Sequence, residues 1–560
     1  MSKGKMHSQK GKPVRVFFAF AVLAFVALFA HAQTTSGCGN LAITKGGISD
    51  PSKLASEANC AGNTPTAAET AEALRLEQIK MLKEKEPVLP PVPTPLPVPA
   101  STAQIGINAS AGNYYSYERI WANLAYRGSE WFAREPADTF RADGYPNRGG
   151  RIFLNIPQAV FTGAPTRVTC TWKGAGKIFM DGDRVEQSYG DHVASVVWQR
   201  RSPEIPGGIF INFSEGNRSD PFRDLDCREA GVVQNGVFDQ RFVDDMRPYR
   251  VIRYLDWSVA NANTPVTWAT RSLPDGAPGS DGVPIEHQVD LANLTGADVW
   301  FTIPWNADED YVRRFATLVR DRLAPSRRAY FEAGNEVWNF GFPVATQALN
   351  EGVAESLDPD KYSNNLMRYA EKSIWMHKIL SDVFKANPSR LVRVLGIQSG
   401  NTWALDKMMG FRDLRTSLDA VAIAPYFGHD MLRDATATTA SLSARFLTLE
   451  ASRVVANDQA IRTKAAVAKY RLRTIVYESG QHIVPNDANA PAAAEMQRSP
   501  LMGQAYDRYY ADMKSILGDT IMVYSATGPI SKYGAWGIRE YAGQPISDTP
   551  KRRAVLDAGR

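Results

Sequence analysis

The sequence predicts an α/β fold: a (β/α)8 TIM barrel with a β-sandwich-like domain inserted between its first and second strands. Eight apolar runs of strand length follow one another from residue 105 onward. Helical patterns separate most of them, and this alternation is typical of parallel β/α architecture. The first two runs are about 140 residues apart, where a βα unit needs about 30. This interval has room for a separate domain.

The chain begins with the layout of a secretory signal peptide. Basic residues precede the apolar run 16–30, and Ala30-His31-Ala32 forms a small-x-small cleavage site before Gln33. The run is shorter than the roughly 20 residues of a membrane-spanning helix. We therefore expect residues 1–32 to be removed, the mature protein to be secreted (extracellular or periplasmic), and no membrane span to remain. An uncleaved anchor is the alternative.

The charge balance argues against nucleic acid as a partner. The chain has a formal net charge of +5. Residues 1–32 contain Lys3, Lys5, Lys10, Lys12 and Arg15 and no acid, so the mature chain is formally neutral. Binding to nucleic acid requires a clustered basic surface, and no long Lys/Arg run remains after cleavage.

Residues 33–103 form an N-terminal region that precedes the barrel. Residues 66–86 are rich in Ala, Glu, Lys and Leu and are predicted to be helical. They run into residues 87–99, PVLPPVPTPLPVP, which is typical of a semi-rigid polyproline II spacer. We expect the barrel to begin near Gln104.

The barrel is expected in two parts, residues 104–148 (first strand and helix) and 232–545, followed by a C-terminal tail, 546–560. The predicted strands are 105–110, 249–257, 297–305, 328–336, 391–399, 418–426, 473–479 and 520–526. The predicted helices include 115–131, 284–294, 308–323 and 362–384.

Residues 149–231 are expected to form the inserted β-sandwich-like domain. Short alternating runs such as TRVTCTW and VASVVW are punctuated by Gly and Pro. An even number of cysteines in an exported protein suggests disulfides. The economical pairing is Cys38–Cys60 with Cys170–Cys227, and the two other pairings remain open.

Polar residues stand where several barrel strands end, which is where barrel active sites lie. The fourth strand ends in Asn335-Glu336 and the seventh in Glu478, while Arg253 lies on the second and Tyr426 ends the sixth. Two carboxyl groups that flank a cleft suit the cleavage of glycosidic bonds, since one delivers a proton and the other attacks the anomeric carbon.

The surroundings of the two carboxyls suggest how the roles divide. A nearby cation lowers a carboxyl pKa, so Arg253 is expected to keep Glu478 ionised, with a second hydrogen bond from Tyr426. Glu336 is then the carboxyl whose pKa rises. Asn335 is expected to bind the sugar hydroxyl beside the reacting carbon. Because successive side chains of a strand point to opposite faces, Glu332 is expected to point into the barrel as a structural carboxylate.

These residues resemble the large clan of retaining (β/α)8-barrel glycoside hydrolases, which includes many cellulases, mannanases, xylanases and β-glucosidases. The resemblance covers roughly residues 104–542 without the insert. It implies hydrolysis of the β-glycosidic bonds of a poly- or oligosaccharide with retention of configuration, with Glu336 as acid/base and Glu478 as nucleophile. Val337 stands where Pro is frequent after Asn-Glu, so no family within the clan is assigned.

Aromatic side chains near strand ends are candidates for stacking on sugars, and Trp338 and Trp536 are favoured, with plain packing as the alternative for each. No metal site and no cofactor are expected, because no Cys or His spacing supports zinc and His287, His429 and His482 are scattered. The main rival hypothesis is a non-catalytic carbohydrate-binding protein on a degenerate barrel. A weaker one is a surface structural protein tethered by the Pro-rich arm.

Overall fold

The computed structural model describes residues 103–155, 166–199, 208–276, 282–433 and 440–560. The expected signal peptide, nearly all of the 33–103 region and the Cys38–Cys60 pair lie outside the described residues. Within the described ranges, none of the helices combines the length and the hydropathy that a membrane crossing requires.

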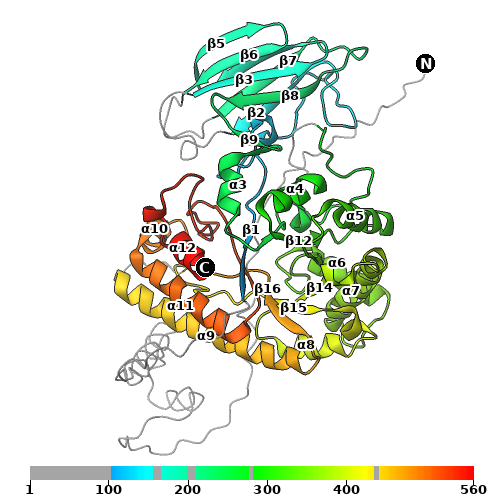
Figure 1. Ribbon diagram of the computed structural model, residues 1–560, viewed down its shortest axis with the longest axis vertical. Helices are drawn as coiled ribbons and strands as arrows, with labels where there is room; N and C mark the ends of the chain where they lie inside the picture. The colour runs from blue at the N-terminus through cyan, green and yellow to red at the C-terminus, as the bar shows by residue number, and fades with distance from the viewer. Residues whose placement is uncertain (1–102, 156–165, 200–207, 277–281, 434–439) are drawn as a thin grey trace, which may run out of the picture. The chain divides into compact units, whose positions relative to one another are not determined.

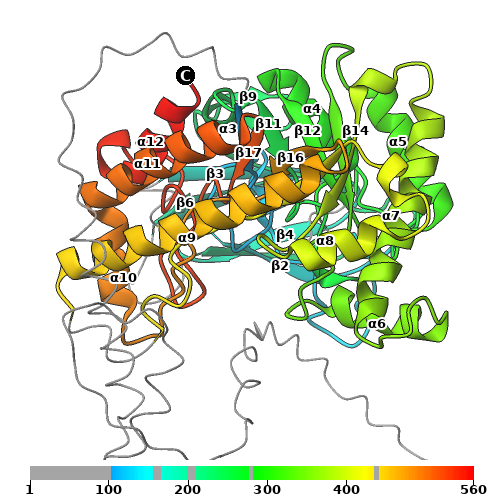
Figure 2. The ribbon, with the colours of Figure 1, turned by 90° about the horizontal axis from the view of Figure 1, so that it is seen from below.

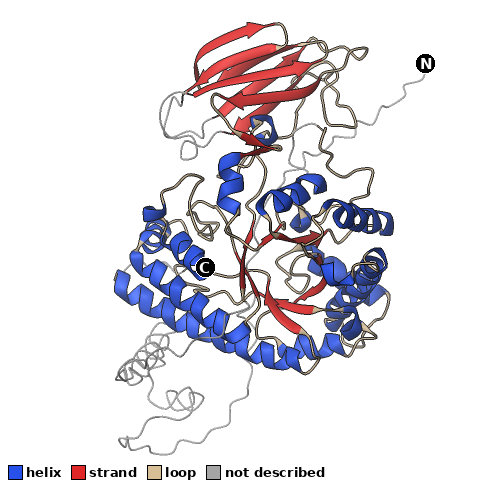
Figure 3. Ribbon diagram, in the orientation of Figure 1, coloured by secondary structure: helices blue, strands red, loops and turns tan. Residues whose placement is uncertain are grey.

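Eight parallel strands close into a barrel, in the order in which they occur along the chain (Figures 1 and 3). They are β1 (Gln104–Asn108), β11 (Val251–Arg253), β12 (Asp298–Ile303), β13 (Ala329–Ala333), β14 (Leu391–Gly396), β15 (Ala420–Ile423), β16 (Arg473–Val476) and β17 (Thr520–Val523). The seam is closed by β1, in which Ile107 pairs with Ile252 on one side and with Val523 on the other. The predicted (β/α)8 barrel is confirmed.

Helices cover the outside of the barrel, as Figure 2 shows. They are α3 (Gln240–Met246), α4 (Ile285–Thr295), α5 (Glu309–Arg322), α6 (Pro343–Ala354), α7 (Ser363–Val383), α8 (Thr402–Met409), α9 (Leu442–Ala468), α10 (Ala490–Arg498), α11 (Pro500–Leu517) and α12 (Pro550–Ala558). Apolar side chains of the strands and helices form one continuous core between the two layers. Residues 546–560, expected as a tail, include α12, whose Ala554 and Val555 are buried in that core.

The predicted helix 115–131 is wrong. Only a 3-10 turn, η2 (Leu124–Arg127), forms there. Backbone pairing explains the difference, because Trp121 bridges to Phe238, Asn123 to Arg228 and Gly128 to Leu154. The segment uses its backbone groups for β-bridges to other parts of the fold, and these replace the hydrogen bonds of a helix.

The interior of the barrel is filled by apolar side chains, and polar side chains lie at the C-terminal ends of the strands. The apolar side chains that point inward are Val251, Trp300, Tyr330, Val392, Val394, Ala420, Ala422, Ile475, Tyr477 and Met522. Two residues farther along β11 and β13, Arg253 and Glu332 point the same way, because side chains alternate along a strand. This alternation brings charged groups to the C-terminal ends of the strands, which we call the mouth of the barrel.

The insert consists of two antiparallel sheets with a common core, so the predicted β-sandwich between the first two barrel strands is confirmed. Three strands form one sheet, β2 (Gly150–Asn155), β7 (Gly208–Ser214) and β4 (Lys177–Gly182). Four form the other, β5 (Arg184–Gly190), β6 (Val193–Trp198), β3 (Thr166–Lys173) and β8 (Arg223–Glu229). A short hairpin, β9 (Gln234–Asn235) with β10 (Phe238–Asp239), leads back to the barrel.

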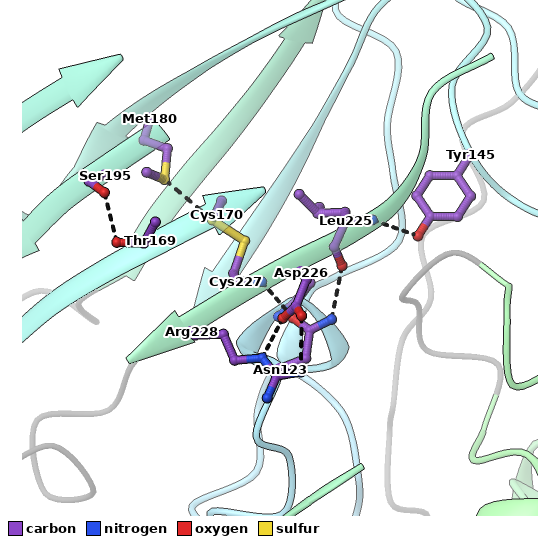
Figure 4. The surroundings of a disulfide bond; sticks show 11 residues. Asn123, Tyr145, Thr169, Cys170, Met180, Ser195, Leu225, Asp226, Cys227 and Arg228 are labelled. Carbon is purple, nitrogen blue, oxygen red and sulfur yellow. Dashed lines mark hydrogen bonds and ion pairs between the residues drawn. A yellow bond between two sulfur atoms is a disulfide. The ribbon is translucent and has the colours of Figure 1, made fainter. Parts of the chain in front are cut away.

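A disulfide joins Cys170 and Cys227, which face each other on the neighbouring strands β3 and β8 (Figure 4). This is the pairing that the spacing favoured. Asn123 binds the same strand from outside the insert, since its amide donates to the carbonyl of Leu225 at 2.8 Å and accepts from the amide of Cys227 at 2.8 Å. The side chains of Trp131 and Tyr145 also lie in the sandwich core. Part of the 104–148 segment therefore packs with the sandwich.

Candidate active site

A single buried guanidinium organises the mouth of the barrel. Arg253 is fully buried. Its Nη1 donates to Glu478 Oε1 at 2.7 Å and to Asn108 Oδ1 at 2.9 Å. Its Nη2 donates to Asn335 Oδ1 at 2.9 Å, and its Nε to Glu332 Oε1 at 3.1 Å. Four of the side chains that line the mouth thus take their position from one residue of β11.

Glu332 lies on the inner side of this network. Its side chain is buried, forms an ion pair with Arg253 and accepts a hydrogen bond from Thr302 Oγ1 at 2.8 Å. All of these contacts are internal to the barrel, as the alternation along β13 predicts. Glu332 therefore balances the buried charge of Arg253.

Glu478 and Glu336 are held by different kinds of donor. Both oxygens of Glu478 are bonded, Oε1 to Arg253 and Oε2 to the Tyr426 hydroxyl at 3.0 Å. Glu336 accepts from the Tyr477 hydroxyl at 2.8 Å and from Asn339 Nδ2 at 2.7 Å. Among the described residues, no cation forms an ion pair with Glu336. Its partners are neutral, whereas Glu478 has a cation in direct contact.

The turn that carries Glu336 has an uncommon backbone. Glu336 has φ +44° and Gly334 has φ +64°, both in the left-handed region. A side chain larger than glycine rarely adopts that region, and such residues concentrate at functional sites. The turn is closed by a backbone hydrogen bond of 2.7 Å from Asn339 to Glu336, which places the Asn339 amide beside the carboxyl group.

Burial raises the pKa of both carboxyls. For Glu478 it raises the pKa to about 8 against the lowering effect of Arg253, and the charge of Glu336 adds to the rise. Burial also raises the pKa of Glu336, against hydrogen bonds from Asn339 and Tyr477. The expectation that Arg253 makes the pKa of Glu478 low is thus wrong in its net direction, because desolvation outweighs the guanidinium. The raised pKa values favour a proton shared by the two carboxyls at a pH where ordinary carboxyls are ionised.

The two candidate tryptophans, Trp338 and Trp536, have different surroundings. Trp536 lies in the loop after β17, with its ring 5.4 Å from His482 and 6.0 Å from Tyr524. His482 is in turn 5.1 Å from the ring of Tyr426, the residue that binds Glu478. Trp338 instead packs against the core between strands and helices. Trp536 is therefore connected to the site by ring contacts, and the contact found for Trp338 is packing.

Several residues of the mouth escaped the sequence analysis. Tyr477 precedes Glu478 directly, and the alternation that places Glu332 inside the barrel would also have placed Tyr477 there. His429 and His482 carry no such signal. They are far apart in the sequence but stack with their centroids 4.4 Å apart, because the loops after β15 and β16 pair at Phe427 and Gln481.

Both imidazoles are neutral at neutral pH. Burial lowers the pKa of His482 to about 3, and His429 lowers it further. Burial lowers the pKa of His429 as well. In the described parts of the chain, no group of three or more His, Cys, Asp or Glu side chains is placed to hold a metal ion.

A cavity of about 210 Å³ lies at the opposite end of the barrel, beside Gln104, Arg328, Arg473 and Asp519. Its arginines are paired, Arg328 with Asp298 at 3.0 Å and Arg473 with Asp519 at 2.7 Å. These pairs tie neighbouring strands together at the N-terminal end of the barrel, where residues serve stability.

No protein-family model matches the chain, and no curated protein matches it by sequence. Among solved structures, it is similar to a GH51 arabinofuranosidase from Xanthomonas axonopodis pv. citri, at 12% identity and TM-score 0.38, over 53% of this chain and 62% of that one. It is also similar to an α-L-arabinofuranosidase from Thermotoga maritima, at 12% identity and TM-score 0.35, over 58% and 64%.

A GH5-4 broad-specificity endoglucanase from Ruminococcus flavefaciens matches at 11% identity and TM-score 0.35, over 57% of this chain and 85% of that one. The chain spans less than two thirds of either arabinofuranosidase. The (β/α)8 barrel that the resemblance implies is present in the structure. At these identities and TM-scores the likeness carries no conclusion about the chemistry of this chain.

Proposed function

We propose that this protein is a secreted glycoside hydrolase that cleaves β-glycosidic bonds of a poly- or oligosaccharide with retention of configuration. One observation carries the proposal. Two carboxyls that follow different strands, the buried Glu478 and the partly exposed Glu336, lie at the mouth of the barrel with raised pKa values, and each is oriented by its own pair of donors. Such a pair is what a two-carboxyl glycosidase requires.

The contacts favour Glu478 as the ionised member of the pair. A cation in direct contact stabilises a carboxylate, and the Tyr426 hydroxyl adds a second hydrogen bond to the same group. Glu336 has only neutral donors. One negative charge on the pair also makes a second one unfavourable. We therefore assign the shared proton to Glu336 when substrate is bound.

The reaction then proceeds in two displacements. Glu336 gives its proton to the leaving glycosidic oxygen while Glu478 attacks the anomeric carbon, so that the aglycone leaves as an alcohol and a glycosyl ester forms on Glu478. In the second step, the carboxylate of Glu336 takes a proton from water. The water oxygen attacks the anomeric carbon and releases Glu478 as a carboxylate. Both displacements invert the carbon, so the product keeps the original configuration.

Neighbouring residues suit the binding of the sugar. The amide oxygen of Asn335 accepts a hydrogen bond from Arg253, and its Nδ2 donates to Asn261 Oδ1 at 3.1 Å. An amide nitrogen has two donors, so one N–H of Asn335 remains for the sugar hydroxyl beside the reacting carbon. The indole of Trp536 offers an aromatic face for stacking on a sugar ring.

Variants of the two carboxyls test the mechanism. Glu478→Ala should reduce hydrolysis of aryl β-glycosides by several orders of magnitude, and added azide should restore part of the rate by forming a glycosyl azide of inverted configuration. Glu336→Ala should slow the cleavage of poor leaving groups far more than that of activated aryl groups, which need little protonation. NMR of the first product of the wild type reports its anomeric configuration.

Three results would contradict the proposal: an inverted product from the wild type, full activity in either variant, or no hydrolysis of any aryl glycoside or glycan. Sugar binding without turnover would instead support the non-catalytic alternative. Glu309→Ala, on the exposed surface of α5, is a control that should leave activity unchanged. Export is tested by N-terminal sequencing of the secreted protein, which should begin at Gln33.

A further inference from the structure

A third carboxyl at the mouth has no role in this mechanism. Asp256 follows β11, three residues after Arg253, and is partly accessible. Its turn is fixed by the next residue, because Trp257 is buried and its Nε1 donates to the carbonyl of Ser110 at 2.7 Å. Within the described residues, no hydrogen bond or ion pair reaches the side chain of Asp256. Arg253 does not satisfy it, since its donors are used by the four partners described above.

Asp256 lies on the mouth side of the barrel, because it follows the C-terminal end of β11. Burial raises its pKa to about 6 against the lowering effect of Arg253. Its charge is also the largest cause that raises the pKa of Tyr524, the residue after β17. Since β1 lies between β11 and β17, Asp256 and Tyr524 flank the end of that strand.

Ring contacts connect Tyr524 with the residues that hold the carboxyl pair. Tyr524 contacts Trp536, Trp536 contacts His482, and His482 contacts Tyr426, with centroids 5.1–6.0 Å apart. Tyr426 donates to Glu478. These contacts connect Tyr524, whose pKa the charge of Asp256 raises, with the candidate nucleophile Glu478.

The charges at the mouth are negative on balance. Arg253 is balanced by Glu332, the pair Glu336 and Glu478 keeps one negative charge, and Asp256 adds another above its pKa. Burial lowers the pKa of both stacked imidazoles, which favours their neutral forms. Arg433, whose charge helps to lower the pKa of both imidazoles, forms an ion pair with Asp430. A ligand with its own carboxylate would be repelled here, whereas hydrogen-bond donors would be attracted.

We propose that Asp256 is a specificity-determining residue, whose carboxylate accepts hydrogen bonds from the hydroxyl or ammonium groups of the bound sugar and excludes sugars that carry a carboxylate at that position. The inference rests on the proposed function, which makes this mouth a sugar site. A carboxylate accepts through both oxygens, so it fits two neighbouring donors of a sugar ring. The ligand supplies the partners that the free protein lacks.

Binding to a variant that cannot turn over separates this inference from catalysis. Glu478→Gln keeps the shape of the site and serves as the parent protein. An array of neutral, amino-sugar and uronic-acid oligosaccharides identifies its best ligand, and titration calorimetry gives the Kd. We expect a neutral or an amino sugar, and the two arms distinguish hydroxyl from ammonium donors. Adding D256N should weaken binding by about ten- to hundredfold, the usual effect of losing hydrogen bonds to a charged group.

Two further variants control for charge and folding. D430N removes an exposed negative charge beside the imidazoles and should leave the Kd unchanged. D256E keeps the charge at a shifted position and should bind with intermediate affinity. D256N should unfold at the same or a higher temperature than the parent, because it removes an unpartnered charge.

The inference is overturned if a uronic-acid glycan binds best, if D256N binds as tightly as its parent, or if D430N has the same effect as D256N. It is also overturned if no glycan binds. If the wild type hydrolyses glycans and D256N binds as tightly as its parent, the role of Asp256 is contradicted and the proposed catalytic function stands. Weakened binding in D256N without any hydrolysis by the wild type would remove only the proposed catalytic function.

Discussion

At the scale of single residues, Glu336 and Glu478 differ in the charge of their partners and share the desolvation that raises their pKa values. Arg253 contacts one of them, and neutral donors contact the other. Because each charge raises the pKa of the other group, the pair titrates as a unit in two steps. The form with one proton on the pair is the form that the proposed mechanism uses.

This coupling predicts the pH profile of kcat/KM, which reports the free enzyme. Activity should fall on the acid side as the pair takes up its second proton. On the alkaline side it should fall as the last proton leaves, near pH 8 rather than near the ordinary 4.5, since the pKa of Glu478 is about 8 in the presence of Glu336. Initial rates with an aryl glycoside from pH 4 to 10 measure both limbs.

Glu336→Gln is the control for this profile. With an activated aryl substrate it should lose the alkaline limb, and its acid limb should move to lower pH because the neighbouring charge is gone. An alkaline limb that persists unchanged in this variant would assign that proton to another group.

The sequence predicted the residues whose position follows from a strand end. Glu336, Glu478, Arg253 and Tyr426 were found because each lies at or near the C-terminal end of a barrel strand. The net direction of the pKa of Glu478 could not be predicted, because desolvation depends on everything packed around the group. The stacking of His429 on His482 depends on the pairing of two loops, which leaves no periodic signal.

At the scale of elements, apolar runs located every barrel strand but overstated its length. The run 249–257 contains a strand of only Val251–Arg253. Beyond it, Tyr254 follows the strand and Trp257 lies in a turn, and both are buried in the core. In the sequence, a buried apolar residue of a turn cannot be told from one of a strand. The helix α12 was missed because its sequence, PKRRAVLDA, is short and four of its nine residues are charged.

Helix α12 anchors the loop that carries Trp536. The amine of Lys551 is buried and donates to the carbonyl of Ala535 at 2.7 Å, and Gln481 Nε2 donates to the same oxygen at 2.7 Å. Burial lowers the pKa of Lys551 to about 7. This element thus connects the C-terminal residues with the lining of the mouth.

The lowered pKa predicts how Lys551 affects stability. Between pH 7 and about 10.5 the unfolded chain binds a proton that the folded chain does not, so the amine's contribution to stability becomes more favourable as pH rises through this window. The melting temperature of the wild type relative to Lys551→Met should therefore rise by at least about 2 °C from pH 7 to pH 10. Differential scanning calorimetry of both proteins measures it.

Lys514→Met is the matched control, because the Lys514 amine also donates to a backbone carbonyl, that of Ala558 at 2.8 Å, but is partly exposed. Its melting temperature should stay parallel to that of the wild type. Parallel curves for Lys551→Met as well would mean that the amine of Lys551 is charged throughout this range.

At the scale of the whole molecule, the barrel and the sandwich have separate cores, but the chain does not divide between them at the expected boundaries. The sandwich core includes Leu124, Trp131 and Tyr145 from before the insert and Ala542 from after the last barrel strand. Composition located the insert, since its short alternating runs differ from barrel elements. Its edges depend on packing partners far apart in the sequence, which no local pattern records.

Two deletions test where the boundary lies. Removal of 149–231 would leave Leu124, Ala125, Trp131 and Tyr145 without their apolar partners, so we expect aggregation. Removal of 124–227 joins Asn123 to Arg228, which already lie side by side in a β-bridge, and should yield a soluble barrel. Soluble yield, size-exclusion chromatography and melting temperature compare the two proteins.

The opposite ranking, with a soluble product only from the 149–231 deletion, would show that the 124–148 segment belongs to the barrel. Failure of both deletions would mean that the barrel requires the sandwich for its own stability.

The bridge between Asn123 and Arg228 has a consequence for how the barrel folds. The first strand must find β11 across the whole insert, and the entropy lost in closing a loop grows with its length, by about 0.6 kcal/mol for each doubling. Once the sandwich has folded, Asn123 and Arg228 are neighbours, so the remaining search spans only short tethers on either side of the bridge. An insert that folds first would thus shorten the effective loop that this pairing must close and speed the closure of the barrel.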